Sequence, residues 1–140
     1  MEFTRRFQFG EYVSEYRQIL AKLERLAHNQ GSYKLEAYGF VMAALHDTLK
    51  KLSEARHVTG KELLEGIRRY GLDQYGPMAR LVFNYWGVES TLDFGKIVFD
   101  LVDAGFMSKN EEDSLDDFRD VYDLKEAFDK PSRVVPDRSA

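Results

Sequence analysis

The chemistry that this chain could perform is most evident in the carboxylates of residues 105–124. Four aspartates follow one another closely there: Asp113, Asp116, Asp117 and Asp120. Clustered carboxylate oxygens are ligands that Ca²⁺ prefers, but the alternating ligands, central glycine and final glutamate of an EF-hand loop are absent. A carboxyl group that acts in acid–base catalysis needs a raised pKa, and nothing in an exposed acidic run would raise the pKa of Asp116 or Asp117. We therefore interpret this segment as a solvated acidic surface.

No other group of reactive residues supplies a candidate active site. The chain has no cysteine, and its three histidines lack the paired spacings that bind zinc. A phosphate-binding GxxxxGK[ST] loop and a GxSxG nucleophile elbow are both absent. The tripeptide Asp93-Phe94-Gly95 matches a kinase motif, but no glycine-rich loop accompanies it. We expect no cofactor, no metal and no catalytic residue, and leave open only a ligand-binding or hydrolytic pocket between helices.

Composition and charge indicate one globular domain. The 140 residues are 44% hydrophobic and 31% charged, which is enough apolar material for one core. The formal net charge is -4, yet the first 70 residues carry 12 basic and 9 acidic side chains, and the last 70 carry 8 and 15. This asymmetry favours a basic partner at the acidic half, or two copies attracting each other head to tail. Without a membrane-length apolar run, a signal sequence or cysteines, we expect a cytoplasmic protein.

Apolar side chains at helical spacing predict about five helices. They cover residues 11–27, 34–53, from 59 to between 71 and 76, 77–86, and 91–104. Two of them begin with a capping box, in which a hydroxyl and a carboxylate three residues apart satisfy free backbone amides: Thr59 with Glu62 and Ser90 with Asp93. The fourth helix is expected to face inward with Met78, Leu81, Val82 and Tyr85.

Beyond the fifth helix the pattern favours a short β-hairpin. Residues 106–109 and 118–124 are its expected strands, and residues 110–117 form a polar tip. A helix over the acidic segment is the alternative, because Ser108 and Glu111 also form a cap. The predicted fold class is therefore mainly α, with about five helices and a C-terminal winged-helix-like unit that includes the hairpin. The alternative is an all-α bundle without a hairpin.

Residues 81–124 resemble a winged-helix unit. Trp86-Gly87-Val88 is similar to the tight turn between its helices, residues 91–104 take the place of the recognition helix, and residues 101–107 lead into the wing. The expected limits are residues 1–130 for a single helical domain, about 60–124 for its winged-helix-like part, and 131–140 for a flexible tail after a last helical turn at 124–128.

Four further stretches together resemble an uncharacterised protein family of Planctomycetes and Verrucomicrobia. They are YKLEAY at 33–38, HVTGKELL at 57–64, YGPMAR at 75–80 and DFGKIVF at 93–99. The resemblance spans about residues 33–128. It implies no activity, because none is established for that family.

Charge determines which function these features favour. DNA affinity depends on Lys and Arg that neutralise phosphates, whereas the helix at 91–104 carries three aspartates and one lysine, and the expected wing is strongly acidic. We therefore expect no direct DNA binding through this face, and predict a non-catalytic protein–protein interaction module. The alternative is a nucleic-acid-associated transcriptional regulator that binds through a partner subunit or a basic patch. That patch would consist of Arg56, Lys61, Arg68 and Arg69.

The residues expected to bind a partner combine the acidic segment with nearby aromatic side chains, because Tyr and Trp are favoured at interface hot spots. They are Asp113, Asp116, Asp117, Asp120, Tyr75, Tyr85 and Trp86. The expected partner is another protein, no membrane is involved, and a homo-oligomer remains open.

Overall fold

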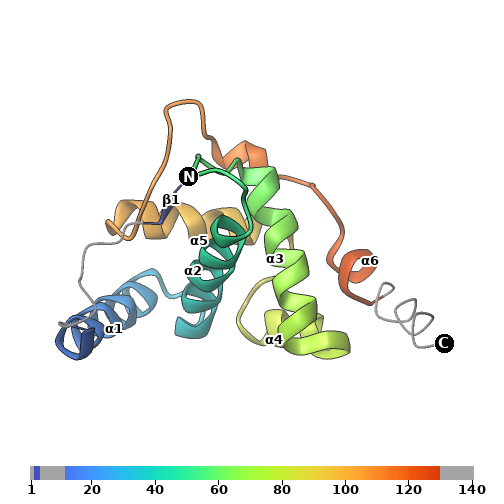
Figure 1. Ribbon diagram of the computed structural model, residues 1–140. Helices are drawn as coiled ribbons and strands as arrows, with labels where there is room; N and C mark the ends of the chain where they lie inside the picture. The colour runs from blue at the N-terminus through green and yellow to red at the C-terminus, as the bar shows by residue number, and fades with distance from the viewer. Residues whose placement is uncertain (1, 4–11, 130–140) are drawn as a thin grey trace.

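The computed structural model describes residues 2–3 and 12–129, and the part it describes is mainly helical. Its α-helices are α1 (Tyr12–Gln30), α2 (Leu35–Lys50), α3 (Gly60–Tyr75), α4 (Ala79–Tyr85), α5 (Thr91–Asp103) and α6 (Leu124–Asp129). Two 3₁₀ helices, η2 (Gly76–Met78) and η3 (Leu115–Phe118), and two strands, β1 (Glu2–Phe3) and β2 (Met107–Ser108), complete the order (Figure 1).

The mainly α class is confirmed, whereas the expected tail lies outside the described residues. No described helix is long and apolar enough to cross a membrane.

Helix α5 lies at the centre of this arrangement. Helices α2 and α3 pack side by side across it, η3 and β2 cover it further along, and α4 packs beside the end of α3 (Figure 1). Along α5 the exposed residues are Lys96 and Asp103, whereas its apolar side chains are buried or half-buried. Helix α1 packs mainly on α2, with Leu23 as its buried contact.

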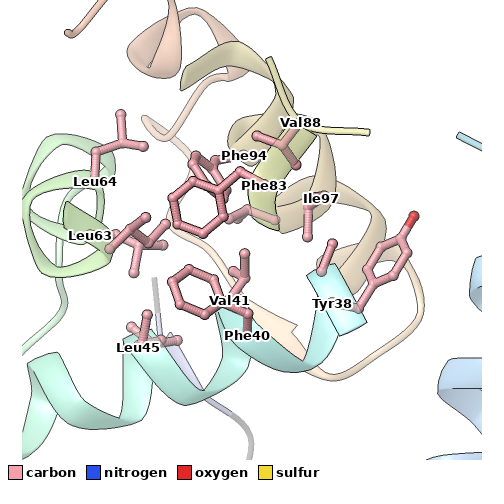
Figure 2. Close-up of a cluster of buried hydrophobic side chains, with 14 of the residues drawn as sticks. Tyr38, Phe40, Val41, Leu45, Leu63, Leu64, Phe83, Val88, Phe94 and Ile97 are labelled. Carbon is pink, nitrogen blue, oxygen red and sulfur yellow. The ribbon is translucent and has the colours of Figure 1, made fainter. Parts of the chain in front are cut away.

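Aromatic rings from several helices form the middle of the core. Phe83 of α4 is fully buried, and its ring centroid lies 5.2 Å from that of Phe40, 5.3 Å from Phe94 and 5.0 Å from Phe128. Figure 2 shows Phe83 between the side chains of α2, α3 and α5. Because edge-to-face ring pairs add to the free energy of apolar burial, this cluster holds four helices together.

Two tyrosine–aspartate hydrogen bonds connect α2 and the residues before it to α5. The Tyr33 hydroxyl donates to Asp93 Oδ1 at 2.5 Å, and the Tyr38 hydroxyl donates to Asp100 Oδ2 at 2.7 Å. Burial, and then the hydrogen bond to the carboxylate, raise the pKa of both hydroxyls. They therefore stay protonated at neutral pH, and they position the two elements instead of acting as bases.

Both predicted capping boxes are confirmed at the starts of α3 and α5. At α3, the Thr59 hydroxyl accepts from the Glu62 amide at 3.1 Å, and the Glu62 carboxylate accepts from the Thr59 amide at 2.9 Å. The Arg56 guanidinium also donates to both oxygens of Glu62, at 3.0 and 2.9 Å. Local sequence thus determines where these two helices begin.

The contacts of Glu62 predict a pH-dependent contribution to stability. The hydrogen bonds from Arg56 and the Thr59 backbone lower the pKa of Glu62 from 4.5 to about 2. A carboxyl group whose pKa falls on folding stabilises the protein above its unfolded pKa, and this contribution is lost as the pH falls towards the folded pKa. Because 41% of the Glu62 side chain is exposed, solvent screening reduces the contribution to about 1 kcal/mol. We expect Glu62→Gln to lower the free energy of unfolding by this amount at pH 7. Near pH 2 the variant and wild type should have the same free energy of unfolding, as measured by urea denaturation.

Glu54→Gln is the matched control, since it removes the same charge from an exposed loop position. A Glu62→Gln deficit that stays unchanged between pH 7 and pH 2 would contradict this prediction.

The prediction of a hairpin between residues 106 and 124 is wrong. Strand β2 pairs antiparallel with β1, with Glu2 opposite Ser108 and Phe3 opposite Met107. The expected second strand, residues 118–124, instead contains the end of η3, a turn and the start of α6. Ser114 and Asp117 form a capping box that starts the 3₁₀ turn, and this local pairing outweighs a weak strand signal. The alternative helix over the acidic segment is limited to that turn.

The expected inward face of the fourth helix is also wrong. Of its four residues, Val82 is half-buried against the core, but Met78, Leu81 and Tyr85 are exposed, and Phe83 and Trp86 are buried instead. The segment is apolar on both sides, so periodicity alone does not select the buried face. The larger aromatic side chains occupy the core because they remove more apolar area from water.

Candidate interaction surfaces

The acidic loop after β2 is fixed to the domain by Phe118. This side chain is fully buried between α3 and α5, and it lies so close to Gly95 that a Cβ there would be 2.6 Å from its ring. The buried Thr91 hydroxyl donates to the Phe118 carbonyl at 2.6 Å and accepts from the Val121 amide at 3.2 Å. These contacts hold the backbone that carries the acidic residues.

Three of the four predicted aspartates take part in the structure of the loop itself. Asp113 accepts from the Asn110 amide at 2.8 Å, and Asp117 accepts from the Ser114 amide at 3.0 Å. The exposed Asp116 forms an ion pair with Arg119, with 2.8 Å between Oδ1 and Nε. Their carboxylates are therefore partly satisfied within the loop.

The fourth aspartate belongs to a cleft that sequence reasoning did not identify. Asp120 lines a cleft of about 270 Å³ together with Glu89 and Asp123, at the start of α5. Within the described part of the chain, none of these three carboxylates forms an ion pair. Asp120 has a left-handed backbone conformation, with φ of 52°. The remaining lining residues are Ser90, Thr91, Tyr122 and Leu124.

The predicted aromatic residues do not gather beside these acids. Trp86 is 6% exposed and packs on Phe83, with 5.7 Å between ring centroids, and the half-buried Tyr75 packs on Trp86 at 5.8 Å. Tyr85 is 72% exposed. All three lie at the end of α3 where α4 packs, whereas the acidic loop packs at its start (Figure 1). A 16-residue helix is about 24 Å long, so the turn that carries Asp116 and Asp117 lies apart from these aromatic residues, whereas Glu89 of the cleft follows Tyr85 by four residues.

The basic residues named in the alternative hypothesis are mostly paired with glutamates. Arg56 pairs with Glu62 at 2.9 Å, and Arg68 pairs with Glu65 at 2.8 Å. The Arg69 guanidinium lies 3.6 Å from the same Glu65 carboxylate. A phosphate would have to compete with these carboxylates. On helix α5 the exposed residues are Lys96 and Asp103, and Asp93 and Asp100 are half-buried, so its accessible side carries more negative than positive charge.

The chemistry available at the acidic cleft is electrostatic. Among residues 12–129, no group of three or more His, Asp or Glu side chains is arranged to hold a metal ion. The cleft carboxylates accept hydrogen bonds and attract positive charge, which suits an ammonium or guanidinium group. Glu89 precedes the Ser90 cap directly, but its proximity to Asp120 depends on the tertiary fold and leaves no local sequence signal.

Comparison with protein-family models, with curated proteins and with solved structures found no match to this chain. The resemblances to the winged-helix unit and to the bacterial family therefore stay predictions.

Proposed function

We propose that this protein is a non-catalytic protein-interaction module that binds a basic segment of another protein through its acidic face. The acidic face consists of the loop at residues 109–123 together with Glu89. The observation that carries this proposal is the cleft in which Glu89, Asp120 and Asp123 lie together without an ion pair among the described residues. A lysine or arginine side chain of the partner supplies the missing positive charge.

The rigidity of the loop supports this role. Its backbone is fixed by buried Phe118 and by both hydrogen bonds of the Thr91 hydroxyl. A preorganised set of carboxylates loses less conformational entropy on binding than a mobile one. The surplus of acidic residues in the second half of the chain also accelerates encounter with a basic partner.

The test uses a fluorescently labelled octalysine peptide and fluorescence anisotropy at low and physiological salt. The cleft variant combines Glu89→Gln, Asp120→Asn and Asp123→Asn. Asparagine tolerates the left-handed conformation of residue 120 and replaces Asp123 as the cap that accepts from the Glu126 amide. The cleft variant loses three exposed charge contacts of about 0.5 kcal/mol each, so we expect it to bind octalysine roughly tenfold more weakly than wild type.

The control variant loses the same three charges outside the acidic face, through Glu24→Gln, Glu36→Gln and Glu54→Gln, all at exposed positions. We expect it to weaken octalysine binding less than about threefold, because it changes only the long-range field. Equal weakening by the two triple variants, or no measurable binding by wild type, would contradict the proposal.

A further inference from the structure

The chain segment that includes α4, at the end of α3, has almost no charge of its own. Between Asp73 and Glu89 the only charged residue is Arg80. Its guanidinium is paired with Asp129, with Nε 3.1 Å from Oδ1 and Nη2 2.8 Å from Oδ2. In a chain with 31% charged residues, this segment has the depletion of charge that is typical of the central part of a protein interface.

Three large apolar side chains lie exposed on this segment. Met78 at the end of η2 and Leu81 and Tyr85 of α4 are 53%, 57% and 72% exposed, and their spacing of three and four residues places them on one side of this helical segment. We call them the α4 stripe. Their joint exposed area is of the order of 350 Å², within the range of the largest patches on monomeric proteins, which are often functional. Helix α4 lies at the edge of the fold (Figure 1).

We propose that the α4 stripe is an interface between two copies of this chain, packed antiparallel about a two-fold axis at Leu81. In this pairing Leu81 faces its own counterpart, and Met78 of one copy faces Tyr85 of the other. The stripe is self-complementary in this way because Leu81 lies three residues after Met78 and four before Tyr85. Methionine sulfur makes favourable contacts with aromatic rings, and a two-fold interface repeats each contact twice.

A second copy fits this surface better than a charged partner does. A charged segment would lose hydration against the three apolar side chains of the stripe, and Arg80, the one charged residue within the segment, is already paired with Asp129. Lys34 stands at one end of the stripe, with its ammonium 5.3 Å from the centroid of the Tyr85 ring. Two such stripes bury on the order of 700 Å², which is less than the roughly 1,200 Å² of a stable interface. The dimer is therefore weak and forms reversibly.

Sedimentation velocity from about 20 µM to about 1 mM protein tests this interface. Wild type shifts from monomer towards dimer over this range. Leu81→Glu and Leu81→Lys each place two like charges across the axis and weaken dimerisation at least about tenfold, whereas their equimolar mixture recovers it through Glu–Lys pairing. Ser53→Glu and Ser53→Lys, which add the same charges at an exposed loop position, leave self-association unchanged. Circular dichroism verifies that each variant is folded.

Three outcomes would overturn the interface. These are a monomeric wild type at about 1 mM, self-association that Leu81→Glu does not affect, and two repelling variants whose mixture stays monomeric. A monomeric wild type would mean that the stripe does not bind a second copy. Self-association without an effect of Leu81→Glu would mean that the dimer contact lies elsewhere, and a monomeric mixture would exclude the axis at Leu81. The triple variant of the acidic cleft retains dimerisation, so this interface and the proposed function fail independently.

Discussion

Phe83→Ala should lower the free energy of unfolding by about 3–5 kcal/mol, because it empties the middle of the aromatic core. Phe83 is fully buried, and its ring lies within 5.3 Å, between centroids, of Phe40, Phe94 and Phe128. These neighbours belong to three different helices, so no single shift fills the cavity. Domains of this size are stable by only about 5–15 kcal/mol, and urea denaturation will measure the loss directly.

Leu81→Ala is the matched control, on the same helix two residues away. Leu81 is 57% exposed, and we expect its truncation to cost less than about 0.5 kcal/mol. The two variants together determine which side of α4 is buried. A large loss for Leu81→Ala with a small one for Phe83→Ala would reverse the observed orientation of this helix.

The contrast between α4 and the capped helices explains what sequence could predict. Helices α3 and α5 begin where Thr59–Glu62 and Ser90–Asp93 predict, because a capping box is completed within four residues. Helix α4 has seven residues and apolar side chains on both sides. Its orientation depends on which side chains fill the space between the other helices, and this is a tertiary property.

The strand partner of β2 could not be predicted for a related reason. A hairpin needs a second strand nearby in the sequence, whereas β2 pairs with β1 at the other end of the described chain. Two-residue strands leave no alternation in the sequence. Phe118 was expected in the returning strand, but it is the buried anchor of η3.

The acidic character of the candidate site was predictable, but its geometry was not. The run of aspartates indicates an acidic surface from composition alone. Capping and ion pairs occupy Asp113, Asp116 and Asp117 within the loop. The cleft instead brings Asp120 beside Glu89, 31 positions earlier in the sequence, through the docking of the loop on the start of α5. That docking requires the absence of a side chain at Gly95, where the contact with Phe118 is closest.

Gly95→Ala should therefore destabilise the protein by about 2–3 kcal/mol, although alanine is the better helix former. Its Cβ would lie 2.6 Å from Cβ and Cγ of Phe118. These atoms are close to the backbone of η3, so they move only if the loop moves. The acidic cleft should be displaced with it, and octalysine binding should weaken in the same variant. Urea denaturation and fluorescence anisotropy will measure the two effects.

A double-mutant cycle with Phe118→Ala isolates this contact. Once the ring is removed, Gly95→Ala should cost little or become favourable by up to about 1 kcal/mol, which gives a coupling of about 2–3 kcal/mol. Gly39→Ala is the control, because Gly39 is also helical but has no atom within 4 Å of its added Cβ. We expect it to stabilise α2 by up to about 1 kcal/mol. If Gly95→Ala were tolerated as well as Gly39→Ala in the wild-type background, the loop would not be held against α5 by this contact, and the cleft would lose its structural basis.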